Sequence, residues 1–489
     1  MEQVEGGSQP RVPLSTKLFF GSGSVAEGVK NTAFNVFLLF YYNQVLGLPG
    51  TWTGAAIFLA LCVDAVADPV IGSLSDGWSS RFGRRHPFMY AAPLPMALGF
   101  ALLFAPPAGL SDGALFAWLL GFAICVRVAM TLYMLPSNAM VPELTPHYDE
   151  RTSLVSYRFL FGWTGGIAIS QLAYLHYFAS PAGTTDGLLQ GARYAGFGGA
   201  CALLVGASIL VSAAGTHHLI PRLARPDSVA RFSWSRFRGE VRDVLHSPSY
   251  RVLIGAALFA SVAGGFSDVV GLYVNKFFWE LSQEQMALLV YGLVGALLIG
   301  VAVARPLTER LDKKTAALGL AGFAISFGPL PIFLRLLGLF PANGDPLLLP
   351  LIVGHTVLVV ACVVAIGITV SSMLADVADE TELATGKRQE GMLSATISFT
   401  AKATSGLGGL VAGVALDLID FPRGAAPGTV EPSKVAALGL AVGPGLMLLY
   451  LATLAFLSRY DITRKRHGEI VGALALRRAE RAAGTVLRN

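Results

Sequence analysis

Twelve apolar stretches, each at least 20 residues long, constrain this chain more than any other feature. A helix needs about 20 apolar residues to cross a bilayer core about 30 Å thick. The stretches in the 489-residue chain fall at 17–45, 51–76, 87–107, 113–140, 153–179, 191–216, 249–277, 284–306, 315–340, 346–375, 391–418 and 434–457. The sequence therefore predicts an all-α membrane protein with twelve transmembrane helices.

The composition agrees with a membrane protein, because only 14% of the residues are charged and 54% are hydrophobic. A soluble chain carries about a quarter charged residues. The glycine-rich pieces GFGGA and GLGGL lie inside apolar stretches, so we interpret them as helix-packing surfaces. No nucleotide-binding loop, zinc spacing or hydrolase motif occurs in a suitable context. We therefore expect no enzyme and no cofactor.

Basic residues gather in the linker 217–248, in the tail 458–489 and in two short turns that contain Arg84–Arg85 and Lys313–Lys314. The intervening connections PPAGLSDG and SPAGTTDG are nearly free of Lys and Arg. Cytoplasmic loops are the basic ones in membrane proteins. We expect a multi-pass protein of a bacterial-type inner membrane, with segment 1–16 and the tail both cytoplasmic. Orientation explains the net charge of +5 better than a nucleic-acid partner does.

The linker divides the chain into two predicted six-helix halves, 17–216 and 249–457. DGWSSRFGRRHP after the second stretch is echoed by RPLTERLDKKT after the eighth, and VPELTPHYDERTS after the fourth by LADVADETELATGKRQEG after the tenth. Parallel repeats of this kind are the organisation of major facilitator transporters. Basic cytoplasmic turns occur in any membrane protein, so each echo alone is a weak signal.

Two carboxylates, Asp64 and Asp68, lie one helical turn apart in the second stretch and therefore on one face. They stand roughly 12 to 18 Å from the helix end near Asp76, close to the bilayer middle. Ionised groups there are costly and mark ion or proton sites. The alternative is a structural pair satisfied by a neighbouring helix.

The sequence resembles the glycoside–pentoside–hexuronide:cation symporters, whose best-studied member is the melibiose permease. The resemblance runs from about residue 17 to the end of the twelfth stretch. The segments that carry it are FYYNQVLGL, DAVADPVIG with RFGRRHP, residues 136–158, and ADVADETELATGKRQEG followed by Lys402. It implies a major facilitator fold and cation-coupled symport.

The resemblance assigns cation binding to Asp64, Asp68 and Thr131, with Na⁺ or H⁺ as the coupling ion. Ala67 departs from the family because sodium-coupled members often carry an amide there. Lys402 stands about 16 Å into its helix, close to the depth of the two acids. Our hypothesis is that Lys402 competes with the cation for them. A fixed salt bridge between the halves is the alternative.

For the substrate, the resemblance points to Arg158, which could otherwise snorkel to the cytoplasmic surface. A polar stripe on the first helix adds cavity candidates, although it could equally make helix-to-helix hydrogen bonds. The remaining candidates are Glu27, Lys30, Asn31, Asn35, Tyr133 and Asn138.

Two substrate-binding aspartates of the melibiose permease correspond to Gly28 and Met134. We expect the change to leave a roomier, more apolar cavity. A sugar or glycoside is the expected substrate, and an amphiphile such as a lysolipid is the alternative. A sensor or scaffold that transports nothing is a third interpretation. Membrane lipids are expected partners, and the protein is expected to be a monomer.

By the same resemblance, a cytoplasmic gate joins the halves when the inside is closed. Exposed ion pairs are individually worth about 1 kcal/mol or less, yet a gate needs only a small bias. A solvated loop is the alternative for any one residue. The gate candidates are Arg151, Asp376, Asp379, Glu382 and Arg388.

Overall fold

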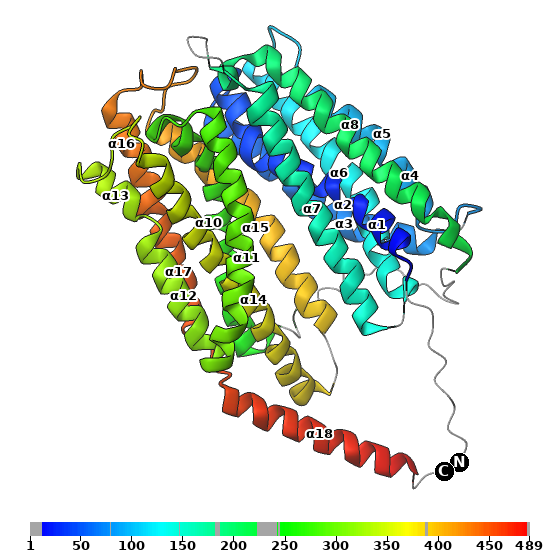
Figure 1. The fold of residues 1–489 in the computed structure, drawn as a ribbon. Coiled ribbons are helices and arrows are strands. Elements are labelled where there is room, and N and C mark those ends of the chain that lie inside the picture. The colour runs from blue at the N-terminus through cyan, green and yellow to red at the C-terminus, as the bar shows by residue number, and fades with distance from the viewer. Residues whose placement is uncertain are drawn as a thin grey trace. The chain divides into compact units, whose positions relative to one another are not determined.

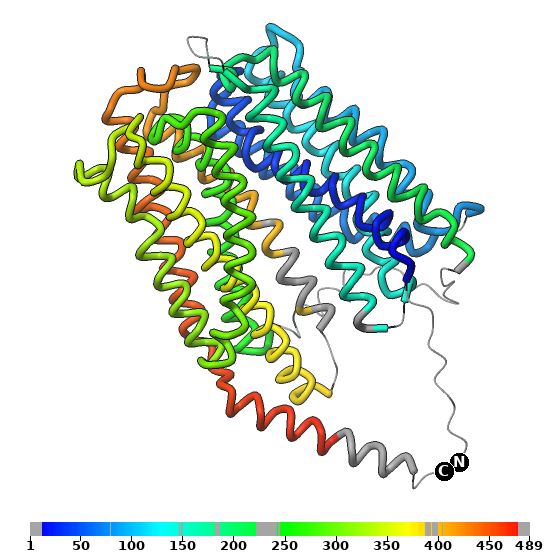
Figure 2. Tube along the Cα trace, in the orientation of Figure 1, coloured from blue at the N-terminus to red at the C-terminus, as the bar shows by residue number. Residues whose placement is uncertain are grey.

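The structure is a computed structural model that describes residues 12–78, 80–145, 147–180, 186–222, 242, 245–386 and 390–486. Within these ranges the chain is helical and contains no strand (Figures 1 and 2). The all-α prediction is confirmed. Arg388 lies outside the described residues.

The chain divides into two compact units. The first comprises Met1–Phe34, Leu59–Phe178 and Gln190–Phe232. Its described elements are α1 (Leu14–Ser22), α2 (Ser24–Thr32), most of α3 (Gly50–Gly77), α4 (His86–Ala91), α5 (Pro93–Leu103), α6 (Asp112–Leu144), α7 (Tyr148–Leu172), the π-helical turn η3 (Ala173–Tyr177), α8 (Gly191–Thr216) and the 3-10 turn η5 (His217–Arg222).

The second unit comprises Asn35–Phe58, Ala179–Leu189 and Ser233–Asn489. The π-helical turn η1 (Ala33–Leu38) crosses the boundary. The described elements of this unit are η2 (Tyr41–Val45), the start of α3, η4 (Gly187–Leu189), α10 (Pro248–Tyr273), η6 (Val274–Phe278), α11 (Gln283–Arg310), α12 (Lys313–Phe327), α13 (Leu330–Leu336), α14 (Leu348–Thr385), α15 (Glu390–Leu418), α16 (Pro432–Leu440), η7 (Ala441–Gly445), α17 (Leu446–Leu457) and α18 (Arg464–Val486).

Among the described residues, nine helical segments are long and apolar enough to cross a membrane. The other three predicted spans, 17–45, 153–179 and 391–418, are helical as well. These three contain Glu27 and Lys30, Arg158, and Lys402, respectively. Polar side chains lower the hydropathy of a span, and in membrane helices they face a bundle interior or a cavity.

Several of the apolar helices leave most of their surface outside the protein core. Only 17% of the most apolar window of α14 is buried, and only 11% of the corresponding window in 432–457. In water, so large an exposed apolar surface would cause association. In a bilayer it is the surface that lipid covers.

Within each unit, the basic turn after the second helix pairs with an acid near the end of the fourth. Arg84 and Arg85 both contact Glu143 Oε1 at 2.5 Å in the first unit. Lys313 Nζ lies 2.7 Å from Asp376 Oδ1 in the second. The echoed segments therefore make matching contacts. The boundaries of the predicted halves remain a prediction.

The packing units differ from the predicted halves because residues 35–58 and the described part of 179–189 belong to the second unit. Asp417 on α15 accepts hydrogen bonds from the backbone N–H groups of Gly50 (2.9 Å) and Thr51 (2.7 Å). These two N–H groups lie at the N-terminus of α3 and have no hydrogen-bond partner inside the helix. The carboxylate of Asp417 therefore satisfies them. Tyr273 adds a hydrogen bond to Asn43 at 2.9 Å.

Glycines form close helix crossings in both units. A side chain at Gly198 on α8 would place its Cβ 2.7 Å from Phe104 Cβ. On α10 and α15, a Cβ at Gly265 or Gly408 would collide with a carbonyl oxygen of the facing helix. The structure therefore places GFGGA and GLGGL at packing surfaces.

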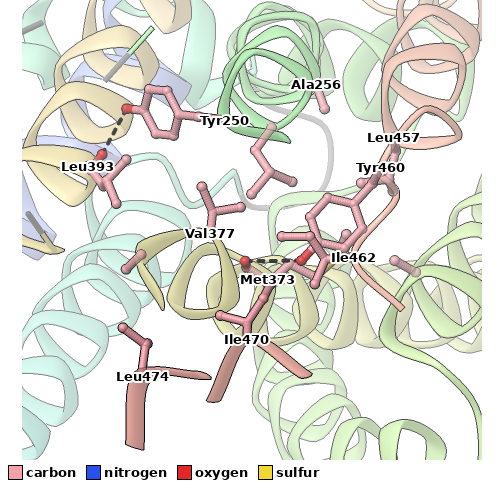
Figure 3. Packing of buried hydrophobic residues seen from close by; sticks show 13 residues of the cluster. Tyr250, Ala256, Met373, Val377, Leu393, Leu457, Tyr460, Ile462, Ile470 and Leu474 are labelled. Atoms are coloured by element: carbon pink, nitrogen blue, oxygen red, sulfur yellow. Dashed lines mark hydrogen bonds between the residues drawn. The ribbon is translucent and has the colours of Figure 1, made fainter. Parts of the chain in front are cut away.

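The C-terminal helix α18 packs against the end of the second unit (Figure 3). Ile470 and Leu474 from this helix join a buried cluster with Met373, Tyr460 and other apolar side chains. The Tyr460 hydroxyl donates to the Met373 carbonyl at 3.3 Å. Burial raises the pKa of Tyr460 well above its usual range, so the hydroxyl remains a donor. The predicted basic tail thus contains a packed helix.

Candidate functional site

Helix α3 carries Asp64 and Asp68 into the interior of the first unit. Asp64 is 5% exposed and Asp68 is half-buried. The helix continues through Pro69. Because proline has no backbone N–H, the helix lacks one internal hydrogen bond next to the acids. The two carboxylates point from one face toward α6, where Thr131 meets them.

The Thr131 hydroxyl bridges the two acids. Its Oγ1 lies 2.8 Å from Asp64 Oδ1 and 3.0 Å from Asp68 Oδ1, and the residue is 4% exposed. Both distances are in the range of O–H···O hydrogen bonds. The three residues assigned to the cation site thus lie together. Their oxygens suit a hard cation or a proton.

Arg127 is a fourth member of this cluster that the sequence analysis missed. Its Nη1 lies 3.9 Å from Asp64 Oδ2, its guanidinium carbon stands 5.0 Å from the centre of the Phe34 ring, and the residue is buried. Its Nε is buried without a hydrogen-bond partner in the part of the chain that the structure describes. A signal was available, because Arg127 precedes Thr131 by four residues and therefore shares its helix face.

Arg158 on α7 has the features of a ligand-binding residue. Its Nε donates to Ser24 Oγ at 3.2 Å, and its Nη2 lies 3.2 Å from the sulfur of Met134. The residue is 7% exposed, so it does not reach the membrane surface as a snorkelling arginine would. Its Nη1 is buried and makes no hydrogen bond with any described residue. A guanidinium with an unused donor can bind hydroxyl or carboxylate oxygens.

The polar stripe on the first helix divides between the two units. Glu27 and Lys30 are half-buried on α2, and Asn31 is exposed. Glu27 is near enough to Arg158 for their charges to interact. Asn35 belongs to the second unit and donates to Asp268 Oδ2 at 3.3 Å. Glu27 therefore lies on the side of the stripe that is close to Arg158.

Gly28 does not widen a cavity. A side chain there would collide with the carbonyl oxygen of Gly162 and place its Cβ 2.7 Å from the nitrogen of Gly166, because α2 packs along α7 at this point. The expectation of a roomier cavity is wrong for this position. Glycine is required at the helix crossing instead.

The remaining substrate candidates lie on α6. Met134 contacts Arg158 through its sulfur. Tyr133 is fully buried, and its hydroxyl donates to Ser212 at 2.8 Å. Asn138 is exposed. The structure thus places Met134 beside Arg158 and gives Tyr133 an internal partner.

Lys402 lies on α15 with an exposed side chain. It belongs to the second unit, whereas Asp64 and Asp68 belong to the first. Its pairing with the acids therefore remains a prediction.

Three of the gate candidates, Arg151, Asp376 and Asp379, have described partners within their own units. Arg151 donates to the Thr145 carbonyl at 2.9 Å, near the end of α6. Asp376 is buried, and besides Lys313 it lies 3.4 Å from His467 Nε2. Asp379 Oδ2 lies 3.2 Å from the same nitrogen.

Helix α18 therefore contacts two of the predicted gate acids, and it adds an ion pair of 2.7 Å between Arg466 and Glu380. Glu382 is half-buried at the end of α14. The sequence analysis missed the role of α18, although a cationic, amphipathic tail is a signal for docking on an acidic surface.

The described residues contain no group of three or more His, Cys, Asp or Glu side chains that could hold a metal ion. The cluster of Asp64, Asp68 and Thr131 has two carboxylates and a hydroxyl. This donor set fits a monovalent cation or a proton better than a transition metal.

The sequence matches the MFS/sugar transport protein family over residues 19–464. The chain belongs to this family. Members of the MFS/sugar transport protein family with similar sequences include an uncharacterized symporter of Synechocystis sp. It is 26% identical, and the match covers 95% of this chain and 97% of the relative.

Two further relatives are the putative glycoside/cation symporter YagG of Escherichia coli and the isoprimeverose transporter of Lactiplantibacillus pentosus. YagG is 25% identical, with 96% of each chain covered. The isoprimeverose transporter is 23% identical, with 83% of this chain and 80% of the relative covered. The resemblance to cation symporters is confirmed at the family level.

Solved structures confirm the major facilitator fold. The nucleoside transporter NupG is 13% identical with a TM-score of 0.61, and the match covers 92% of this chain and 99% of NupG. The xylose transporter XylE from Escherichia coli is 13% identical with a TM-score of 0.55, covering 92% and 98%. This member of the MFS/sugar transport protein family is a multi-pass membrane protein and a secondary transporter, not an enzyme.

Proposed function

We propose that the protein is a cation-coupled symporter of a sugar or glycoside that works by alternating access. The observation that carries the proposal is the buried cluster of Asp64, Asp68 and Thr131 in the first unit. Two buried acids are costly unless a cation or a proton compensates them. A transporter without ion coupling has no need of such a site.

Arg158 supplies the substrate end of the proposal. Its unused buried donor and its proximity to Glu27 form a polar site able to bind hydroxyl groups. The names of YagG and of the isoprimeverose transporter support a glycoside as the substrate class. The lysolipid alternative rested on a roomier, more apolar cavity at Gly28 and Met134. Gly28 no longer supports it, because this glycine is a packing residue.

Binding of the cation and the substrate together would allow the two halves to rock and expose the site to the other side. Lys402 would compete with the cation for the acids. The acids at the end of α14 would contribute to the cytoplasmic gate, together with Arg151 and Arg388. We place the protein in an inner membrane, as a monomer with both termini in the cytoplasm.

The test is thermal stabilisation of the purified protein by nitrophenyl glycosides, free pentoses and hexoses, and lysophosphatidylcholine, at several pH values with and without sodium. We expect a glycoside to stabilise the wild type, and stabilisation to weaken at least tenfold in Asp68→Asn because ion and substrate binding are coupled. Asp112→Asn, an exposed change at the start of α6, is the matched control.

Stabilisation by lysophosphatidylcholine alone would favour the amphiphile. If no compound stabilises a folded protein and no exchange occurs in proteoliposomes, the protein is a sensor or scaffold and the proposal is wrong.

A further inference from the structure

We infer that Asp268 on α10 and Asn35 on η1 form a substrate subsite in the second unit, and that this subsite binds two adjacent hydroxyl groups of a sugar. Arg158 is not part of it, because Arg158 belongs to the first unit. The inference rests on the proposed function for the substrate being a sugar. It adds which part of the sugar the second unit recognises.

Asp268 is an acid inside a membrane-spanning helix. Helix α10 and the turn η6 form one apolar span over Pro248–Phe278. Asp268 stands about ten residues, or about 15 Å, before the end of this span. That depth is close to the middle of a bilayer core about 30 Å thick. A charged side chain at this depth faces the bundle interior or water rather than lipid, and it marks a functional site.

Asn35 occupies the equivalent position in the first spanning helix. Asn35 and Asp268 are 233 residues apart. The same interval separates η2 (Tyr41–Val45) from η6 (Val274–Phe278), and the first residue of α3 from the first residue of α11. The Asn35 amide donates to Asp268 Oδ2 at 3.3 Å. Residues at equivalent positions of a two-fold repeat touch only near the axis that relates the repeats, and transporters of this organisation bind substrate where their repeats meet.

Asp268 has unused capacity to accept hydrogen bonds. Among the residues that the structure describes, the Asn35 amide is its hydrogen-bond partner, and no lysine or arginine forms an ion pair with it. A carboxylate has about four lone-pair sites, and the side-chain oxygen of Asn35 is a further acceptor. A ligand of this pair must therefore donate hydrogen bonds. Two adjacent sugar hydroxyls can donate to the two carboxylate oxygens while Asn35 keeps its bond to Oδ2.

The face of α10 that carries Asp268 has room for a ligand. Gly264 and Gly271 lie four residues before and three residues after the acid, so they share its face. A Cβ at either glycine would meet nothing within 4 Å, whereas one at Gly265 would collide with α15. Asp268 itself is exposed. A carboxylate at this depth requires that the open space hold water or a polar ligand rather than lipid.

Tyr450 on α17 provides an aromatic side chain near the pair. It is half-buried, and it is close enough to Asp268 for the charge of the acid to act on its hydroxyl. Ligand pockets combine aromatic surface with a small number of placed polar groups. The ring can cover the apolar face of a sugar while the carboxylate and the amide bind its hydroxyl groups.

The first test is the affinity of the purified Asp268→Asn variant for the glycoside that stabilises the wild type. Asparagine keeps the size of the side chain and an oxygen that can accept from Asn35. We expect the half-maximal concentration to rise about tenfold or more, the loss typical of a hydrogen bond to a charged group. Asp420→Asn is the matched control, because Asp420 is an exposed acid of the same unit that pairs with Lys434.

Monodeoxy analogues of that glycoside show whether Asp268 touches the sugar. Removing a hydroxyl that meets the carboxylate should weaken binding to the wild type about tenfold and binding to Asp268→Asn at most about twofold, because groups in contact are not additive. Equal affinities of wild type and Asp268→Asn for the parent glycoside, or additive losses at every hydroxyl, would overturn the subsite. Stabilisation by lysophosphatidylcholine and by no sugar, if lost in Asp268→Asn, would assign a cationic headgroup to the acid and overturn the sugar.

Cysteine reactivity tests the open face without changing Asp268, so it remains available if Asp268→Asn fails to fold. In a variant without the four native cysteines, Gly264→Cys should react with a water-soluble cationic methanethiosulfonate at least about tenfold faster than Gly319→Cys, because thiolates form in water. Gly319 also has open space at its Cβ position, but it lies one turn from the exposed Phe323 on α12. The glycoside should slow the reaction of Gly264→Cys. Equal rates for the two cysteines, or no protection by the glycoside, would contradict the inference.

Failure of the subsite and failure of the proposed function give different results. If a glycoside stabilises the wild type and Asp268→Asn alike, the subsite is wrong and the proposed symport stands. If no sugar stabilises the wild type and none is exchanged in proteoliposomes, the proposed function is wrong, and the sugar subsite is wrong with it.

Discussion

Arg158 is the residue whose chemistry would most directly limit the substrate if it binds the ligand as proposed. Its Nε donates to Ser24 and its Nη2 lies beside Met134, while Nη1 is buried and has no hydrogen-bond partner among the residues that the structure describes. A planar guanidinium can keep these internal contacts and bind a ligand at the same time. A lysine cannot, because its charge is a single point at the end of a flexible chain.

We predict that Arg158→Lys weakens binding of the stabilising glycoside by roughly tenfold or more, the loss expected when a hydrogen bond to a charged group is removed. The measurement is the ligand concentration that gives half-maximal thermal stabilisation. Arg193→Lys, which changes an arginine bonded to Gln190 in the α8 entry loop, should leave this concentration unchanged. Equal affinities for Arg158→Lys and wild type would remove Arg158 from the binding site.

The positions of single residues could be predicted where their spacing along a helix determines which side chains lie together. Asp64 and Asp68 share a helix face because they are four residues apart. The family resemblance assigned Thr131 to the same site. Arg127 has the same four-residue relation to Thr131, but a single arginine in an apolar helix does not show which neighbour it pairs with. The prediction of a roomier cavity at Gly28 was wrong for a related reason. Only the packing of helix α7 shows that a side chain at Gly28 would collide with its backbone.

At the scale of elements, α18 is the least expected feature. Its polar residues Arg466 and His467 contact Glu380 and the acids Asp376 and Asp379, while Ile470 enters the apolar cluster. The acids that were predicted to form the gate therefore also hold this helix. If α18 were released, Asp376 and Asp379 would lose their contacts with His467.

We predict that the double variant Arg466→Ala/His467→Ala increases amide hydrogen exchange in 464–477 by about tenfold or more, because a charge-assisted hydrogen bond contributes about 1.5 to 3 kcal/mol. Hydrogen-exchange mass spectrometry measures the change. Lys465→Ala, an exposed neighbour, is the control. Unchanged exchange would show that the apolar contacts alone hold the helix.

For the molecule as a whole, the bilayer made the helices predictable. A spanning helix needs a fixed apolar length, and the prediction of 284–306 falls inside α11 (Gln283–Arg310). The polar extensions were harder to predict. Helix α14 continues to Thr385, past the predicted end at 375, because the acids beyond the apolar run continue the helix and contact α18. The packing of 35–58 with the second unit depends on Asp417 and Tyr273, which no local pattern indicates.

The orientation of the chain gives a prediction at this scale. In a variant without the native cysteines, Ala342→Cys in the connection before α14 should react with an impermeant maleimide added to intact cells, whereas Lys465→Cys on α18 should not. The basic end of each unit should face the cytoplasm. Gel-shift labelling measures both. Labelling of Lys465→Cys before lysis would contradict cytoplasmic termini.

The crossing of α10 and α15 also limits which substitutions the sequence can accept at this point. Gly264 and Gly265 are adjacent, yet a side chain at the first would meet open space and one at the second would collide with the Ser405 carbonyl oxygen. Two neighbouring glycines thus differ in whether the packing leaves room for a side chain. Gly264 can gain a Cβ without a clash, whereas Gly265 can gain one only if the two helix backbones move apart.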